Sequence, residues 1–254
     1  MKISVIIPSR CDIDPRSPYG DLFLERALQS IRAQTVKVDE ICIGVQEHPP
    51  QLQQLAERYT DWSFRVGRTD TKGQAAALNA AAAVATGDVI TFLEDDDLWQ
   101  PKRLMFGLKV MQDFACEFAS SNQQEVTIDG KAIRINDFPT PSGWLMSAEV
   151  WRRSGGFDEA FRWHLDNDFL GKLLKMGIKR VHLTEQGATI EGRDWLKNVS
   201  QFSQICNTSE SVPLVTRLHN PKGGMCTIAT DPAAKTQSSR EHHAMLERYG
   251  LIPW

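Results

Sequence analysis

Short apolar runs alternate with segments of helical spacing through the first hundred residues, and this order restricts the fold more than any other feature. The apolar runs are rich in β-branched residues, as buried strands are, and the segments between them repeat apolar residues every three or four positions. Strand–helix–strand order predicts a mostly parallel, Rossmann-like sheet flanked by helices, with ligands at the carboxyl ends of its strands. The expected strands are residues 3–8, 40–45, 63–67 and 88–93, and the expected helices are residues 22–34, 52–59 and 73–85.

Beyond residue 100 the pattern is less regular. Residues 125–135 predict a hairpin that turns at Asp129 and Gly130, and from about residue 187 Pro, Gly, Ser, Asn and Thr recur. We therefore expect a single α/β domain with an irregular C-terminal segment. The helices expected here are residues 102–118, 149–154, 166–176 and 239–249.

Composition narrows the class of protein. A length of 254 residues with 41% hydrophobic residues supports a real core. The net charge of −3 predicts no general nucleic-acid patch and no attraction to an anionic membrane. No run of about twenty apolar residues predicts a transmembrane segment, and the start is too strand-like for a signal peptide. Cytoplasmic residence is the expectation, and the five widely spaced cysteines are expected to be free thiols.

Four consecutive carboxylates, Glu94 to Asp97, follow directly on the apolar strand that begins at residue 88. A buried strand cannot accommodate four anions, so they must lie where it leaves the sheet, and a cation would offset their repulsion. Oxygen ligands shared with substrate phosphates suit Mg²⁺ or Mn²⁺. A solvated acidic turn is the alternative.

Five short sequence segments of the chain, which occur in the order typical of the family, resemble those of family 2 glycosyltransferases with the GT-A fold. The resemblance covers roughly residues 1–180 and implies transfer of a sugar from a nucleotide diphosphate sugar, with inversion and with Mn²⁺ or Mg²⁺ on the pyrophosphate. It implies a GT-A domain over residues 1–185, with a nucleotide-sugar half (1–100) and an acceptor half (101–185). Residues 186–254 would be an extension packed on the same domain. The segments are Ser4 to Ser9, Arg26 to Thr35, Gly73 to Asn79, Gly87 to Asp97 and Gly155 to Glu159.

The resemblance assigns roles within the acidic run. Asp95 falls where the family holds the ribose of the donor, and Asp96 falls where a carboxylate binds the metal. Asp97 is expected beside the metal and Glu94 in support. A metal on the pyrophosphate would stabilise the charge that the leaving nucleoside diphosphate gains.

A second carboxylate site is expected at the helix that follows Asp158. The family commonly has Glu-Asp there, with the aspartate as general base. In this chain Leu165 stands at the glutamate position and Asp166 at the aspartate position, so Asp166 is the expected base. Asp168 is expected to support the acceptor side. Helix capping by either aspartate is the alternative reading.

The nucleotide pocket departs from the family pattern, because Gln46 stands where an aspartate usually accepts the uracil imide N–H. An amide oxygen could accept the same bond, so a UDP-sugar is the expected donor, although another base could also be bound. Other loop residues could contact the donor, or could simply be solvated. These are Pro8, Ser9, Arg10, Lys72 and Asn79.

The acceptor side is less defined. Trp144, Trp163 and Trp195 fall where an acceptor groove would lie and could stack on sugar rings, although core packing is an alternative for each. A glycan, a small molecule, a peptide or a modified base would each be a suitable acceptor. No pattern predicts the oligomeric state.

Two other classes of function remain open. A metal-dependent nucleotidyltransferase also combines an α/β fold with carboxylates, but residues 8–20 lack its usual glycine-rich basic loop. A non-catalytic nucleotide-sugar-binding relative is the second class, since Leu165 and Gln46 depart from the family pattern.

Overall fold

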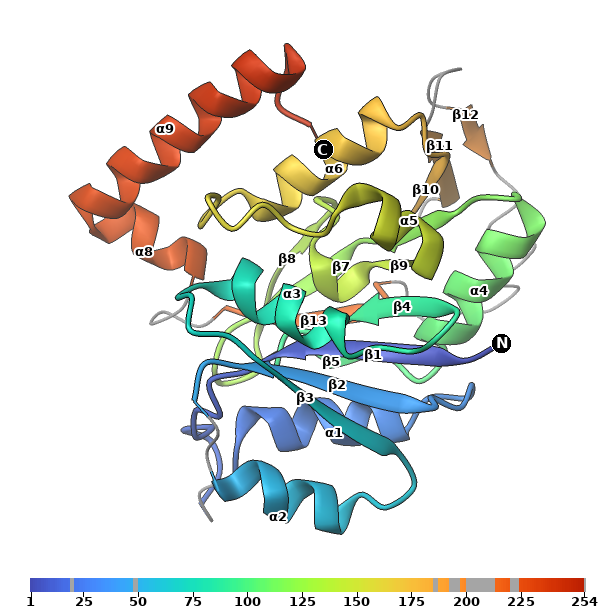
Figure 1. The fold of residues 1–254 in the computed structure, drawn as a ribbon, viewed down its shortest axis with the longest axis vertical. Coiled ribbons are helices and arrows are strands. Elements are labelled where there is room, and N and C mark those ends of the chain that lie inside the picture. Colours follow the sequence, from blue (N-terminus) through green and yellow to red (C-terminus); the bar gives the residue numbers. More distant parts are fainter. Residues whose placement is uncertain are drawn as a thin grey trace.

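The alternating elements of the first hundred residues form one half of a nine-stranded sheet in the computed structural model (Figure 1). The structure describes residues 1–18, 21–47, 50–184, 187–191, 197–199, 213–219 and 224–253, so Trp195 lies outside the described residues. Strand β1 lies between β2 and β4, and β3 follows at the edge, all four parallel. The elements are β1 (Ile3–Pro8), α1 (Phe23–Arg32), β2 (Glu40–Val45), α2 (Pro50–Arg58), β3 (Ser63–Arg68), α3 (Gln74–Ala83) and β4 (Val89–Phe92).

Both faces of β1, β2 and β4 are covered, which is why these strands are mostly apolar, whereas the edge strand β3 is only partly buried and carries Arg65 and Arg68. Alternate residues of a strand point to opposite faces, and Ile7 of β1 packs in the core with α1 and α2 while Ile6 packs in the core with α3. The helices accordingly lie on the two sides of the sheet (Figure 1). The predicted α/β fold class is confirmed.

The sheet continues into the second half of the chain with mixed strand directions. Strand β9 lies between β4 and β6 and is antiparallel to both, whereas β10 is parallel to β6. The strand order is β12-β11-β10-β6-β9-β4-β1-β2-β3. The elements are α4 (Arg103–Asp113), β6 (Phe118–Ser121), η1 (Pro141–Gly143), β9 (Leu145–Ser147), α5 (Ala148–Ser154), α6 (Leu165–Lys175), β10 (Arg180–Thr184), β11 (Gly187–Glu191) and β12 (Lys197–Val199).

The helix expected over residues 102–118 is shorter than predicted. It ends at Asp113, and Ala115 adopts a φ of 46°, a left-handed conformation that an α-helix cannot continue through. Phe118 then starts a strand whose partners, β9 and β10, are distant in sequence. Helical spacing could not reveal this tertiary pairing.

A second, four-stranded sheet joins residues 98–136 in the middle of the chain to residues 215–218. Its order is β5 (Leu98–Trp99), β13 (Val215–Leu218), β7 (Gln123–Val126) and β8 (Ala132–Asn136). The predicted hairpin is confirmed as β7 and β8, with Gly130 at a φ of 82° in the turn. Strand β13 was not predicted, and it inserts between β5 and β7.

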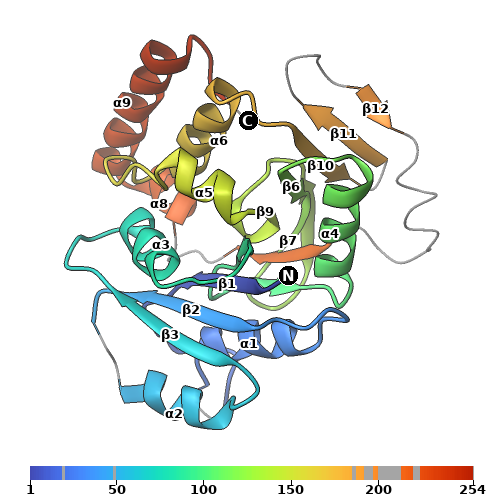
Figure 2. The same cartoon turned by 45° about the vertical axis from the view of Figure 1, so that its right-hand side comes forward.

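The C-terminal helices pack against the middle of the chain. Helix α8 spans Gly224–Thr230 and α9 spans Pro232–Tyr249, beginning seven residues before the predicted start because Asp231 caps it. Helix α9 lies beside α6, as both views show (Figure 2). None of the helices in the described ranges combines the length and apolarity needed to cross a membrane.

Candidate active site

The four acidic residues lie where β4 leaves the sheet, as expected. Burial, together with the charge of neighbouring carboxylates, raises the pKa of Asp95 to about 6 and that of Asp97 to about 7. Burial and the same neighbours raise the pKa of Asp96 well above its usual range. Because the charged forms are disfavoured, a cation placed among these oxygens would be stabilised strongly.

Asp97 is turned away from this edge, which corrects its expected place beside a metal. Its side chain is 1% exposed, and both carboxylate oxygens accept hydrogen bonds. Ser142 Oγ donates to Oδ2 at 2.6 Å, and the backbone N–H of Leu218 donates to Oδ1 at 3.1 Å. Asp97 therefore fastens β13 to the loop after β4.

Asp95 and Ser9, both predicted to contact the donor, lie next to each other at neighbouring strand ends. Ser9 Oγ donates to Asp95 Oδ2 at 2.6 Å, and β1 and β4 are adjacent and parallel. Asp96 receives no side-chain hydrogen bond from the described part of the chain. In that part no three His, Cys, Asp or Glu side chains form a closed metal cage. The Asp96 carboxylate is thus available to an external ligand.

The loops after β1, β2 and β3 carry the other expected donor contacts. Gln46 is exposed, and its Nε2 donates to the carbonyl of Thr71 at 3.0 Å, which joins the loops after β2 and β3. Arg10 is exposed and paired with Asp12. Lys72 is exposed just before α3, whereas Pro8 is buried as the last residue of β1 and serves to place Ser9.

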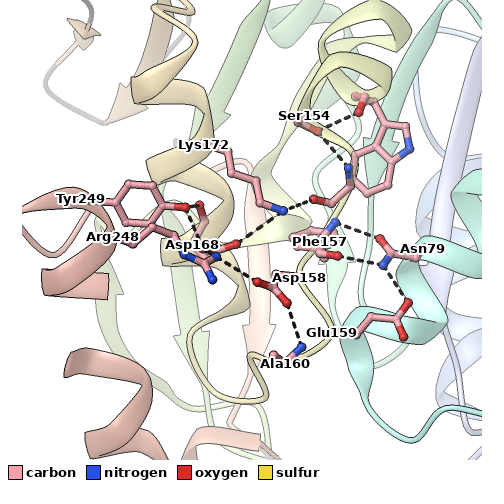
Figure 3. Close-up of polar contacts among 12 residues, drawn as sticks. Asn79, Ser154, Phe157, Asp158, Glu159, Ala160, Asp168, Lys172, Arg248 and Tyr249 are labelled. Atoms are coloured by element: carbon pink, nitrogen blue, oxygen red, sulfur yellow. Dashed lines mark hydrogen bonds and ion pairs between the residues drawn. The ribbon is translucent and has the colours of Figure 1, made fainter. Parts of the chain in front are cut away.

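Asn79 is not available to a donor, contrary to expectation (Figure 3). Its Oδ1 accepts the N–H of Phe157 at 2.9 Å, and its Nδ2 donates to the carbonyl of Phe157 and to Glu159 Oε1. The amide is fully used in joining α3 to the loop of Gly155 and Gly156. Asn79 therefore has a structural role.

Asp166 lies in the first turn of α6 and is partly buried. Its pKa is raised to about 6, because burial and the charge of Glu94 outweigh the opposite effects of the backbone N–H of Asn167 and of Arg217. That N–H donates to Asp166 Oδ1 at 2.9 Å. The charges of Glu94 and Arg217 both act on Asp166, so these groups lie within electrostatic range of one another.

Arg217 on β13 is the residue that the sequence analysis missed. Its guanidinium is attracted to four carboxylates from different parts of the chain, and these contacts raise its pKa despite burial. The nearest ion pair joins its Nη1 to Glu125 Oε1 at 3.5 Å. The only local signal was the short β-pattern of residues 215–218. The carboxylates are Glu94, Asp97, Glu125 and Asp166.

Asp168 is excluded from the acceptor side, because its side chain is completely buried. Arg248 Nη1 and the Tyr249 hydroxyl both donate to Asp168 Oδ1 at 2.7 Å (Figure 3). Lys172 lies 3.6 Å from Oδ2. Asp168 therefore anchors α9 to α6 and does not face a substrate.

Of the three tryptophans expected at the acceptor groove, Trp144 and Trp163 lie in the described residues, and they differ in burial. Trp144 is completely buried, it stacks on Phe157 and Phe169, and its Nε1 donates to Pro139. It belongs to the core and cannot contact an acceptor, which corrects the prediction. Trp163 is partly exposed, with the Arg162 guanidinium 5.0 Å from its ring centroid, so its acceptor role stays a prediction.

An α/β fold with carboxylates at the end of a sheet strand is shared by several classes of nucleotide-dependent enzyme, and comparison with known proteins gives the family. Residues 4–177 match the family described as Glycosyl transferase family 2, and the chain belongs to that family. It is 36% identical over 117 residues to an uncharacterized glycosyltransferase of Nostoc sp., covering 44% of this chain and 33% of that protein. It is 30% identical over 135 residues to another from Rickettsia felis, covering 52% of this chain and 21% of that protein. The chain thus spans a third or less of these curated relatives.

Solved structures with the same fold include those of S. aureus TarS. The structure of TarS residues 1–349 in complex with UDP-GlcNAc superposes with a TM-score of 0.64 at 14% identity, covering 97% of this chain and 67% of that one. The complex with UDP gives a TM-score of 0.59 at 15% identity, covering 87% and 61%. At this identity the likeness establishes the shared fold.

Proposed function

We propose that the protein is an inverting glycosyltransferase that moves a sugar from a nucleotide diphosphate sugar to an acceptor nucleophile. The observation that carries the proposal is that two carboxylates, Asp96 and Asp166, have different surroundings. Asp96 accepts no side-chain hydrogen bond from the described residues and is repelled by its acidic neighbours, whereas the positive charge of Arg217 acts on Asp166, whose pKa is about 6. A carboxylate without a partner suits a metal ligand, and a carboxylate with a pKa near the working pH suits a general base.

Asp166 takes the proton of the acceptor hydroxyl as that oxygen bonds to the anomeric carbon of the sugar. The bond from this carbon to the diphosphate oxygen breaks on the opposite face, so a single displacement inverts the carbon. Arg217 lowers the pKa of Asp166 and so keeps the base ionised near neutral pH. The acceptor is a glycan, a small molecule, a peptide or a modified base.

The residues present fit Mg²⁺ or Mn²⁺. Asp96 offers a carboxylate without a side-chain hydrogen bond, and burial together with the neighbouring carboxylates disfavours the charged forms of Asp95 and Asp96, which a cation would offset. All the candidate ligand atoms are oxygens. Asp96 would hold the ion, with donor phosphates and water completing its shell, while Asp95 faces the ribose. When bound, the ion would stabilise the charge on the leaving diphosphate.

Uridine is the proposed base. The Nε2 group of Gln46 is used as a donor to the carbonyl of Thr71. The Oε1 atom of the same amide can then accept a hydrogen bond from the imide N–H of uracil. The likeness to TarS structures with UDP and UDP-GlcNAc supports the same assignment. Ser9, Arg10 and Lys72 lie on loops at the same edge and complete the proposed donor site.

Thermal shift of the protein with Mn²⁺ and a panel of nucleotide sugars tests the proposal, followed by assay of nucleoside diphosphate release. We expect stabilisation by UDP-sugars, about 2.7 kcal/mol at a hundred times the dissociation constant. Asp96→Asn should abolish the part of this stabilisation that depends on Mn²⁺. Gln46→Ala should weaken UDP binding by about 1 to 3 kcal/mol. Binding without release of UDP would instead identify a non-catalytic relative. Stabilisation by no nucleotide sugar would refute the function.

A further inference from the structure

Glu241 lies in α9, yet its carboxylate reaches the chain just before the proposed base. Its Oε1 accepts the backbone N–H of Arg162 at 2.9 Å. Its Oε2 accepts the N–H groups of Trp163 at 2.8 Å and His164 at 3.0 Å. Three successive N–H groups that converge on one anion form a charge-assisted nest. The side chain that fills this nest is 6% exposed, so water does not compete with it.

The segment held in this way leads directly into Asp166. His164 is the N-cap of α6, and its side chain makes no capping hydrogen bond there. Leu165, which follows, is buried and apolar, so it supplies no acceptor either. The carboxylate that orders the start of α6 therefore comes from a residue 75 or more positions away in the sequence.

Contacts on both sides of Asp166 come from the same C-terminal region. His164 Nε2 is 2.8 Å from Ser238 Oγ of α9. Asn167 Nδ2 donates to the carbonyl of Pro253 at 2.6 Å. The residue before and the residue after the Leu165–Asp166 pair are thus both fixed from outside α6, which restricts where the Asp166 carboxylate can point.

We propose that Glu241 is a positioning residue for Asp166, an inference that rests on the function proposed above. It aligns the base with the acceptor hydroxyl without touching substrate or metal. A displacement of about 1 Å at a reacting group can cost on the order of 10² in rate. Loss of Glu241 should therefore lower turnover and leave donor binding unchanged, since its hydrogen bonds within the described residues all go to residues 162–164.

The test compares three variants using UDP-GlcNAc and Mn²⁺, with release of UDP as the measured reaction. Glu241→Gln keeps the shape but loses the charge and presents an NH₂ group to backbone donors, so kcat should fall roughly 10- to 100-fold with KM for the donor within about two-fold. Glu241→Asp keeps the charge and should recover part of kcat. Glu247→Gln, an exposed change on the same helix, should match the parent.

Hydrogen exchange at the amides of residues 162–164 supplies a readout besides activity. Exchange there should accelerate in Glu241→Gln and not in Glu247→Gln. An active parent whose Glu241→Gln variant keeps its kcat overturns the inference alone. Equal losses of kcat, donor affinity and thermal stability also overturn it, since they indicate a general structural role. A parent that releases no UDP from any nucleotide sugar overturns the proposed function and the inference with it.

Discussion

Asp166 and Asp168 stand two residues apart on one helix, and their surroundings give them opposite roles. Asp168 is completely buried against Arg248 and Tyr249, so its charge is used to join two helices. Asp166 is partly exposed, and burial raises its pKa to about 6. A carboxylate of that pKa is ionised at neutral pH and still accepts a proton readily, as a general base must.

We predict that Asp166→Asn lowers kcat by a factor on the order of 10² to 10⁴ and leaves donor affinity nearly unchanged. The amide preserves the size of the side chain but cannot accept the acceptor proton. Turnover and donor binding measured on the same preparation check this. Asp168→Asn is the matched variant, and it should lose thermal stability because Arg248 then lies beside a neutral group. Transfer within a few-fold of the parent rate in Asp166→Asn would show that this residue is not the base.

We also predict a shifted pH dependence in Arg217→Met. The positive charge of Arg217 lowers the pKa of Asp166, so its loss raises that pKa and moves the acid limb of the kcat/KM profile from about pH 6 to higher pH, by roughly 1 unit. Arg134→Met is the control, since Arg134, on the exposed strand β8, pairs with Glu125 of β7. An acid limb at the same pH in Arg217→Met would rule out this electrostatic role.

Helix α3 illustrates how elements set the donor edge. Its alanine-rich sequence lets the helix backbone approach β2 and β3 closely, because small side chains face the sheet. A Cβ atom added at Gly44 of β2 would lie 1.8 Å from the carbonyl oxygen of Ala77. The glycine is therefore required by contact between backbones, and the distance between the helix and the strand positions the loop of Gln46.

Gly44→Ala should destabilise the protein by at least about 2 kcal/mol, because neither backbone can move away without separating α3 from the sheet. Urea unfolding measures the change. Gly107→Ala in α4 is the control: its new Cβ meets the Leu145 side chain, which can rotate, and alanine favours a helix by about 1 kcal/mol. Equal midpoints for the parent and Gly44→Ala would contradict the close approach.

At the scale of the whole molecule, the acidic edge lowers stability until a cation or protons neutralise it. The folded pKa values of Asp95 and Asp97, about 6 and about 7, lie above the usual carboxyl value near 3.8. Between those values the folded state holds more protons than the unfolded state. The free energy of unfolding contributed by these groups therefore rises as pH falls through that range.

Stabilisation by a bound metal ion should instead increase as pH rises, since protons compete with the ion for the same carboxylate oxygens. We predict that the gain in Tm from Mn²⁺ is larger at about pH 8 than at about pH 5.5. The difference between metal-loaded and metal-free protein at each pH isolates the effect from other titrating groups. Asp96→Asn should lose the gain at both values. A gain independent of pH would place the ion away from these carboxylates.

Sequence periodicity determined much of the fold. The strands and helices of the first hundred residues, the β7–β8 hairpin and helix α6 follow from local spacing and turn residues, because hydrophobic period and backbone geometry act over a few neighbours. The same reasoning located Asp96 at a strand end and Asp166 at a helix start, since charges placed beside apolar runs must lie where an element ends.

Only the tertiary structure decided which polar groups remain free. The polar side chains of Asn79, Asp97 and Asp168 could each bind a ligand, but in the folded chain they are hydrogen-bonded to residues from distant segments. These partners are Phe157, Leu218 and Arg248, respectively. Arg217 reaches the acidic edge because β13 pairs with β7, some ninety positions away in the chain. The local spacing of residues does not predict such pairings, because they form only when the packed core brings remote segments together.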